Sequence, residues 1–184
     1  MTMRIRLATS ADLPAMLEIY RPHVEAGTAS FEYETPSLEA FGARFGAITA
    51  DFPWYAAEED GAVAGFAYAS RPFGRAAYQW LAELSVYVGA GFQGRGAGKA
   101  LYAALERDLT DMGYVSAWAL ITKENAASVA FHEKLGYRFM AEMPDAGFKF
   151  GRWLSVVWYR KDLRDAPDPG PAPLRFRDLN RGEE

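Results

Sequence analysis

A glycine-rich segment, residues 93–99, has the composition and spacing of an anion-binding turn. Gly94, Gly96 and Gly98 stand at every second position and leave the backbone without Cβ atoms, so a bulky phosphate can approach it. A helical pattern starts here, and the free N–H groups and the dipole at a helix start favour negative charge. The segment therefore predicts a phosphate site, and a plain glycine-rich turn is the alternative.

The spacing of the glycines separates this turn from two well-known nucleotide loops. The segment lacks the Gly-Lys-Ser/Thr ending of a Walker loop. Its glycines are two and two residues apart, whereas a dinucleotide fingerprint has them two and three apart. Neither loop explains the pattern.

Hydrophobic periodicity gives the order of the elements that must position this turn. Residues 83–88 alternate with the two-residue period of a strand, and leucines recur with helical spacing after the glycines. The expected strands are residues 4–8, 54–58, 62–69, 83–88, 115–121, 137–143 and 154–160. The expected helices follow the capping-box residues Thr9 and Asp12, begin at Thr35-Pro36, follow Gly98, and cover residues 125–135.

This mixed order predicts an α+β or mixed α/β sheet rather than a strictly parallel one. Residues 59–61 are expected to form a hairpin turn, and residues 144–153 an irregular connection between the last two strands. The prolines that follow residue 163 cannot build a helix or a central strand, so residues 164–184 are expected to form an extended or disordered, charged tail.

The composition limits the class of protein. The chain has 184 residues, half of them hydrophobic, which suits one domain with a sizeable core. A net charge of -4 argues against nucleic acid as the main partner. The absence of cysteine excludes disulfides, thiolate metal sites and cysteine nucleophiles, and His23 and His132 lie too far apart for a metal-ligand motif. We expect no metal.

The same reasoning bears on location. No apolar run approaches the ~18 residues that span a membrane, and the first residues lack the apolar core of a signal peptide. We expect no membrane partner and a cytoplasmic location.

Two motifs together resemble the GNAT family of N-acetyltransferases. Residues 93–98, Gln-Gly-Arg-Gly-Ala-Gly, match that family's pyrophosphate loop, and residues 125–137 match its asparagine-led helix that ends in Leu-Gly-Tyr. Residues 28–32, 77–80 and 147–153 are similar to the branch that acetylates phosphinothricin and methionine sulfoximine or sulfone. The resemblance implies an acyl-CoA N-acyltransferase fold over residues 1–163, with a mixed, mostly antiparallel sheet flanked by helices.

The resemblance also implies acetyl-CoA as cosubstrate and assigns residues to it. The strand after Glu83 would pair its backbone with the pantetheine arm, the glycine-rich turn would hold the diphosphate, and the start of the later helix would bind the arm. Asn125 is also a good helix N-cap, and both roles can coexist. The implied cofactor residues are Val86, Tyr87, Val88, Gln93, Gly94, Arg95, Gly96, Ala97, Gly98, Lys99, Asn125 and Ser128.

Glu83 and His132 are the implied catalytic residues. An amine substrate arrives as an ammonium and must lose a proton before it attacks a thioester, which a carboxylate at the cleft can accept. His132 stands where many relatives carry a tyrosine that protonates the leaving thiolate, and the assignment of acid and base stays open. An ion-paired carboxylate at a strand edge and a core histidine are the structural alternatives.

The substrate end is assigned from the same resemblance. Arg75, with Arg71 as a weaker candidate, would clamp a substrate carboxylate, while Phe31 would shape the pocket. Lys149 is assigned to the substrate as well, and residues 149–153 are expected near a homodimer interface. A solvated loop arginine and packing aromatics are the alternatives.

The resulting hypothesis is an acetyl-CoA-dependent N-acetyltransferase that acts on the α-amine of a small amino acid or analogue, by direct attack. Two alternatives remain at this point: acetylation of a protein N-terminus or polyamine, and a non-catalytic CoA-binding sensor. The expected partners are a small-molecule amine and a second copy of the chain.

Overall fold

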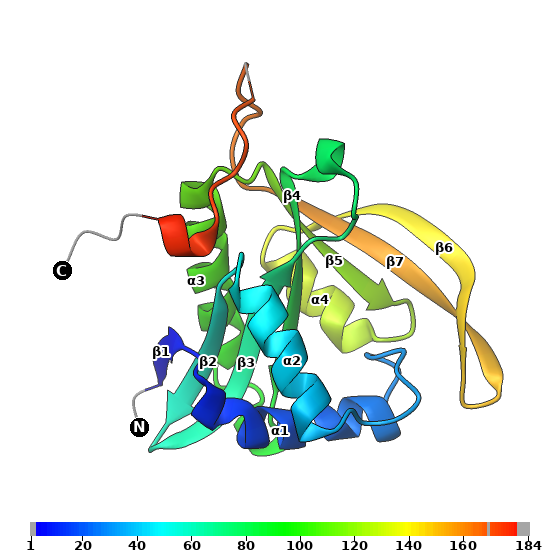
Figure 1. The fold of residues 1–184 in the computed structure, drawn as a ribbon. Coiled ribbons are helices and arrows are strands. Elements are labelled where there is room, and N and C mark those ends of the chain that lie inside the picture. Colours follow the sequence, from blue (N-terminus) through cyan, green and yellow to red (C-terminus); the bar gives the residue numbers. More distant parts are fainter. Residues whose placement is uncertain (1–2, 169, 180–184) are drawn as a thin grey trace.

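The computed structural model describes residues 3–168 and 170–179. A seven-stranded sheet has the order β1-β2-β3-β4-β5-β7-β6, in which every neighbouring pair is antiparallel except β4 and β5 (Figure 1). The strands are β1 (Arg4–Leu7), β2 (Trp54–Glu59), β3 (Ala62–Ser70), β4 (Leu81–Val88), β5 (Ser116–Thr122), β6 (Arg138–Lys149) and β7 (Arg152–Asp162). The predicted mixed, mostly antiparallel sheet is confirmed.

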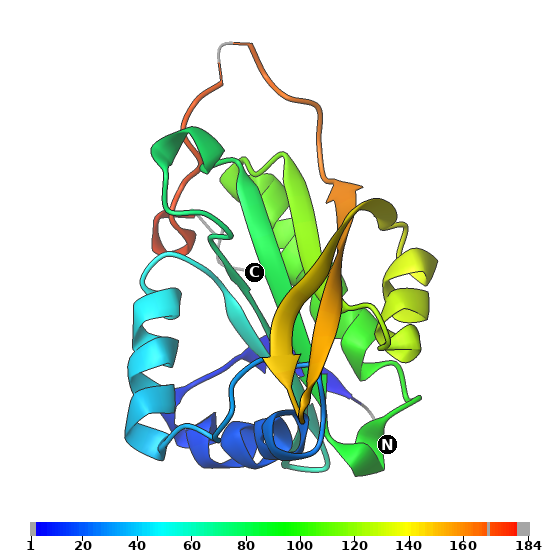
Figure 2. The same cartoon turned by 90° about the vertical axis from the view of Figure 1, so that its right-hand side faces the viewer.

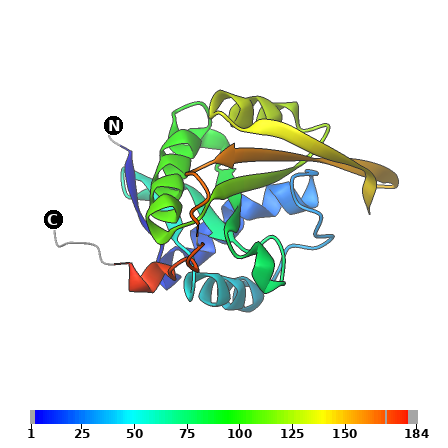
Figure 3. The same cartoon turned by 90° about the horizontal axis from the view of Figure 1, so that it is seen from above.

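Helices cover both faces of this sheet. They are α1 (Leu13–Glu25), α2 (Leu38–Thr49), α3 (Ala97–Met112) and α4 (Ala126–Lys134). Helices α1 and α2 pack on one face around an aromatic cluster that includes Phe41, Trp54 and Phe66. Helices α3 and α4 lie on the opposite face (Figure 3). They contact each other through Tyr102 and Phe131.

Local sequence signals explain most element boundaries. Thr9 and Asp12 form the predicted capping box, with one short 3-10 turn before α1. Helix α2 begins at Leu38 instead of Thr35-Pro36, because the Ser37 hydroxyl accepts a hydrogen bond from the Ala40 N–H at 3.1 Å and caps the helix there.

Two further patterns behave as their spacing predicts. Leu101, Leu105 and Leu109 form the fully buried face of α3. The turn between β2 and β3 places Asp60 and Gly61 at φ values of 52° and 80°, as a two-residue hairpin turn requires.

Strands β4 and β5 separate soon after they meet. Strand β4 pairs with β3 as far as Val88, but with β5 only over three residues, ending at Glu83 and Trp118. Strand β5 nevertheless continues to Thr122. Beyond Glu83, one edge of β4 therefore has no strand beside it, and the sheet opens.

Strands β6 and β7 form a long hairpin that reaches past the rest of the sheet. Figure 2 views this hairpin from the front, with its tip over α1. The predicted irregular connection at residues 144–153 is wrong, because the pairing resumes at Gly147 and Leu154 and continues to a tight turn at Phe150 and Gly151. A register shift between Met143 and Gly147 accommodates Pro144 within the strand.

The described part of the C-terminal tail runs along one end of the sheet and returns to α3 (Figure 1). The indole N–H of Trp80 donates to the Pro171 carbonyl at 2.8 Å, and the Leu174 N–H donates to the Met112 carbonyl at 2.8 Å. Residues 169 and 180–184, which belong to the predicted tail, lie outside the described residues.

Candidate active site

A groove of about 830 Å³ lies where β4 and β5 separate. Its walls come from β4, the glycine-rich turn, the ends of β5, the start of α4, the loop after α1 and the β6–β7 hairpin. Along β4 the side chains alternate: Leu84 packs into the cluster that contains α3, whereas Tyr87 contacts Tyr20 of α1. The groove thus connects the two faces of the sheet.

The glycine-rich turn forms one end of the groove. Gly94 and Gly96 have φ values of 74° and 90°, which side-chain-bearing residues rarely adopt, and Gly96 is the N-cap of α3. A Cβ on Gly98 would lie 3.1 Å from the Phe131 ring, so glycine lets α3 and α4 approach closely without a shift of that ring. The turn therefore has both the backbone shape and the helix start that bind phosphate.

Most of the predicted cofactor residues of this turn line the groove; they are Gln93, Gly94, Gly96, Ala97, Gly98 and Lys99. Arg95 is the exception. Its guanidinium pairs with Glu59 at 3.0 Å and lies 5.5 Å from the centre of the Phe92 ring, outside the groove lining.

The unpaired edge of β4 and the start of α4 form the middle of the groove. Val86, Tyr87 and Val88 line it, together with Asn125 and Ser128. The Asn125 side-chain oxygen accepts a hydrogen bond from the Ser128 N–H at 3.1 Å, which makes it the N-cap of α4. An extended ligand with amide groups could pair with the free β4 edge as an added strand does.

Glu83 lies in the groove at the point where the strands part. Burial raises the pKa of its carboxyl above the ordinary value of 4.5, and no described residue forms an ion pair with it. It is the single carboxylate among the described residues that line the groove. A half-buried carboxylate with a raised pKa is a good proton acceptor.

His132 is buried in the groove wall, with both ring nitrogens in hydrogen bonds. Its Nδ1 lies 2.8 Å from the Ser128 carbonyl oxygen, which can only accept, so Nδ1 carries the proton. Its Nε2 then accepts from the Tyr102 hydroxyl at 2.9 Å. Burial lowers the pKa of His132, although the Ser128 carbonyl opposes this. The ring is therefore neutral at pH 7.

Several groove residues were not found from the sequence: His23, Ser30, Tyr68 and Tyr102. Tyr102 lies among the buried, mostly apolar residues of α3, and it is not part of a recognisable motif. Tyr68 stands opposite Ser85 only because of the β3–β4 register. Pairing of this kind cannot be read from one sequence, so no local signal marks these residues.

A polar network supports the loop after α1. The Tyr20 hydroxyl hydrogen-bonds to Ser30 at 2.7 Å and to Glu32 at 2.6 Å, and Glu32 pairs with Arg44. Burial is the main cause that raises the pKa of Tyr20 to about 12, so it stays protonated. Ser30 and Phe31, in the same loop, line the groove.

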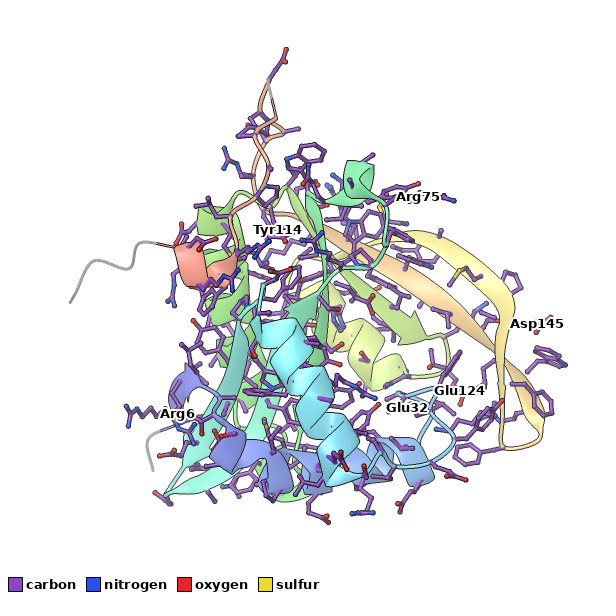
Figure 4. All side chains as sticks on the ribbon, viewed as in Figure 1. Arg6, Glu32, Arg75, Tyr114, Glu124 and Asp145 are labelled. Carbon is purple, nitrogen blue, oxygen red and sulfur yellow. The ribbon has the colours of Figure 1, made fainter. Side chains whose placement is uncertain are left out.

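Three of the predicted substrate residues lie outside the groove lining. Arg71 pairs with Asp51 at 3.5 Å, and Arg75 is exposed on the loop before β4, well apart from Glu32 in Figure 4. Lys149 is buried and bonds to backbone carbonyls. The fourth, Phe31, does line the groove. In the described part of the chain, no cluster of histidines and carboxylates could hold a metal ion, and no helix is both long and apolar enough to cross a membrane.

Comparisons with known proteins agree with this geometry. The chain is 35% identical to a phosphinothricin N-acetyltransferase of Streptomyces viridochromogenes, over 94% of this chain and 93% of that protein. It is 34% identical to an L-methionine sulfoximine/L-methionine sulfone acetyltransferase of Salmonella typhimurium, over 90% and 99% of the two chains.

A solved structure is equally similar. The phosphinothricin acetyltransferase of Sinorhizobium meliloti, determined in complex with AcCoA, superposes with a TM-score of 0.85 and 36% identity, over 97% of this chain and 96% of that one. The model of the acetyltransferase (GNAT) family matches residues 13–137, which include β4, the glycine-rich turn and α4. The chain therefore belongs to the GNAT family of acetyltransferases.

Proposed function

We propose that this protein transfers the acetyl group of acetyl-CoA to the α-amine of a small amino acid or analogue, of the phosphinothricin or methionine sulfoximine and sulfone type. The observation that carries this proposal is one continuous groove that joins a phosphate-binding turn to a single half-buried carboxylate. The names of the relatives support the substrate class.

The residues of the groove fit acetyl-CoA. The N–H groups of the turn after Gln93 would hold the diphosphate, and the free edge of β4 at Val86 and Val88 would pair with the pantetheine amides. Lys99, the single lysine among the described residues of the lining, adds positive charge at the phosphate end. When bound, acetyl-CoA supplies an acyl group activated as a thioester.

Glu83 would accept the proton of the substrate ammonium, directly or through a water molecule. Its raised pKa makes it a stronger base than an exposed glutamate. The free amine then attacks the thioester carbonyl, and a β4 backbone N–H near Val86 stabilises the oxyanion. The chain has no cysteine to form a thioester intermediate, so we propose direct transfer.

The hydrogen bonds of His132 favour a positioning role for this residue. Its Nε2 carries no proton and accepts from Tyr102, and burial disfavours the imidazolium. His132 would therefore hold Tyr102, which also lines the groove, in place, and the departing thiolate would take the second proton that the attacking nitrogen loses, which gives the amide and the thiol. The sequence left open whether His132 acts as an acid or a base, and these hydrogen bonds favour neither.

The lining argues against a polyamine as substrate. A polyamine carries several positive charges and would require several carboxylates, whereas Glu83 is the single carboxylate that the described lining contains. The Arg75 and Arg71 clamps for a substrate carboxylate stay predictions, as does the cytoplasmic location.

A homodimer is part of the proposal. Phe148, Phe150 and Trp153 are exposed at the tip of the β6–β7 hairpin, with 46%, 54% and 63% of their surface accessible. Three neighbouring aromatic side chains without cover are typical of an interface. A second copy of the chain is the partner that we propose for them.

Thiol release in the presence of acetyl-CoA tests the function. We expect release with methionine sulfone or phosphinothricin, and little with spermidine or a short peptide. The Glu83→Gln variant serves as the background control in the same assay. Release with spermidine alone, or with none of the four amines, would contradict the proposal.

A further inference from the structure

Lys149 is a buried lysine whose ammonium bonds to the end of α1 and to the loop that follows it. Its Nζ donates hydrogen bonds to the carbonyl oxygens of Val24, Gly27 and Ser30, at 2.7, 2.9 and 2.7 Å. The residue is 3% exposed. All three protons of the ammonium are therefore used, and no proton remains for a substrate.

The three carbonyls belong to the end of α1 and to residues 27–33, which we name the substrate loop because Ala29, Ser30 and Phe31 line the groove. The loop has no helix or strand of its own. It is held where it is by side-chain and backbone contacts from other elements.

The β6–β7 hairpin supplies several of these contacts, in addition to the Tyr20 network described above. The Tyr33 hydroxyl donates to the Phe148 carbonyl at 2.8 Å. The Phe31 ring lies directly against Gly147, where an added Cβ would stand 2.2 Å from a ring carbon. Two positions after Gly147 in the same strand, Lys149 reaches its three carbonyls. A second element, β5, contributes the Thr122 hydroxyl, which donates to the Thr28 carbonyl.

We propose that Lys149 is a positioning residue for the amine substrate: it latches the substrate loop to the β6–β7 hairpin and so holds Phe31 against Gly147 as one wall of the groove. That this wall binds the amine rests on the proposed function. The latch itself rests on the hydrogen bonds of Lys149. The hairpin tip carries the aromatic side chains of the proposed interface, so the same strand would link the partner to the substrate wall.

The chemistry of the contact explains why lysine stands here. A buried carbonyl without a donor is costly, and a charged donor makes a stronger hydrogen bond than a neutral one. An ammonium has three donors that diverge from one atom and can meet three carbonyls, whereas the planar guanidinium of arginine cannot converge on them in the same way. Loss of Nζ leaves three carbonyls, one at the end of α1 and two in the loop, without this donor at once.

Hydrogen exchange of the free protein tests the latch without any substrate. In Lys149→Met we expect the amides of residues 27–33 to exchange at least ~10-fold faster than in the wild type, since local opening sets their rate. Lys161→Met is the matched control, because it removes an ammonium that pairs with Glu106 at 2.6 Å, away from the loop. Equal exchange of the loop in the two variants would overturn the proposal.

Steady-state kinetics with methionine sulfone separates positioning from a general loss of structure. We expect Lys149→Met to raise the KM for the amine ~10-fold and to leave the KM for acetyl-CoA within ~2-fold, because the turn that holds the diphosphate does not contact Lys149. An equal rise in both KM values would contradict the latch. If the wild type acetylates none of the amines, the proposed function fails, and the exchange experiment still decides on the latch.

Gly147 provides a second test that leaves Lys149 in place. Its φ is not in the left-handed region, so alanine is allowed by the backbone, and the three atoms nearest to the added Cβ all belong to the Phe31 ring. We expect Gly147→Ala to speed exchange in the loop, and to have no such effect in a Phe31→Ala background, because the conflicting ring is gone. An undiminished effect in that background would show that Phe31 is not seated on Gly147. This pair of variants keeps the proposal testable if Lys149→Met does not fold.

Discussion

The two ends of the groove are built in different ways. At the end where we propose that the diphosphate binds, which we call the phosphate end, a turn of consecutive residues, 93–99, contributes its own backbone. At the amine end, side chains from separate elements meet: Glu83 from β4, Tyr68 from β3, His23 from α1 and Phe31 from the substrate loop. One end is made by local conformation, and the other is assembled by the fold.

This difference determines how each end can fail. Strain in one glycine changes the phosphate end directly, because its N–H groups are part of that local conformation. The amine end depends on distant contacts, such as the latch of Lys149, and can be disturbed from positions that touch no ligand. The predictions below probe the two ends separately.

The largest effect should come from Glu83→Gln. The amide cannot accept the substrate proton, so we expect kcat to fall by roughly 100- to 10,000-fold, the range for general acid–base groups. The KM for acetyl-CoA should change little, because the residue lies at the amine end. Glu39→Gln, an exposed change in the first turn of α2, is the control. Unchanged turnover at pH 7 would remove Glu83 from the mechanism.

Gly96→Val should damage the phosphate end alone. Valine at a φ of 90° costs about 1–3 kcal/mol, so we expect a rise in the KM for acetyl-CoA of roughly tenfold or more. The KM for the amine should stay nearly constant. Gly91→Val is the matched control, since Gly91 precedes the turn and has open space around it. A similar loss in both glycine variants would mean that strain at Gly96 is not the cause.

Trp153→Glu tests the homodimer interface that we propose at the tip of the hairpin next to the amine end. If the exposed aromatics at the hairpin tip form a homodimer, a buried carboxylate there should halve the mass measured by light scattering. Phe139→Glu places the same charge at the other end of the hairpin, at a residue that is 55% exposed, and should leave the mass unchanged. A monomeric wild type would contradict the proposed dimer.

Glu83→Gln should also raise stability at neutral pH. Burial raises the pKa of Glu83 above 4.5, so the folded state binds its proton more tightly than the unfolded state. This contribution to stability is present at low pH and is lost as the pH rises from 4.5 through the folded pKa. We expect Glu83→Gln to have a higher Tm than the wild type at pH 7, and the difference to shrink below pH 4.5. A lower Tm at pH 7 would show that the carboxylate has a stabilising partner.

The smallest effect should come from Arg75→Ala. Arg75 is exposed and lies outside the groove lining, so we expect the KM for methionine sulfone to change by less than ~2-fold if the loop keeps this position. A tenfold rise would support the sequence-based prediction, because it would require the loop before β4 to close over the substrate.

The comparison also explains what a single sequence can predict. The glycine-rich turn and the Asn125 cap were found because each depends on residues close in the chain. Glu83 was assigned from the family resemblance; it does line the groove, and its catalytic role stays a prediction. The order of the elements was predicted as well, since periodicity is local.

What the sequence did not reveal depends on contacts between distant segments. Tyr102 meets His132 across two helices, and Lys149 reaches carbonyls more than a hundred positions away in the chain. The long hairpin was missed for a related reason: Pro144 breaks the local pattern, while pairing with β7 restores the strand beyond it. Tertiary pairing overrides local propensity at such points.

The C-terminal tail has a practical consequence for anyone who prepares this protein. Phe176 and Leu179 pack against the core cluster, and the Leu174 N–H donates a hydrogen bond to the carbonyl of Met112 at the end of α3. Truncation of the expressed chain at residue 163, to match the region of family resemblance, would expose the apolar surface that Phe176 and Leu179 cover. We expect such a truncated protein to aggregate during purification. An affinity tag should therefore be added after residue 184 and should not replace residues 164–184.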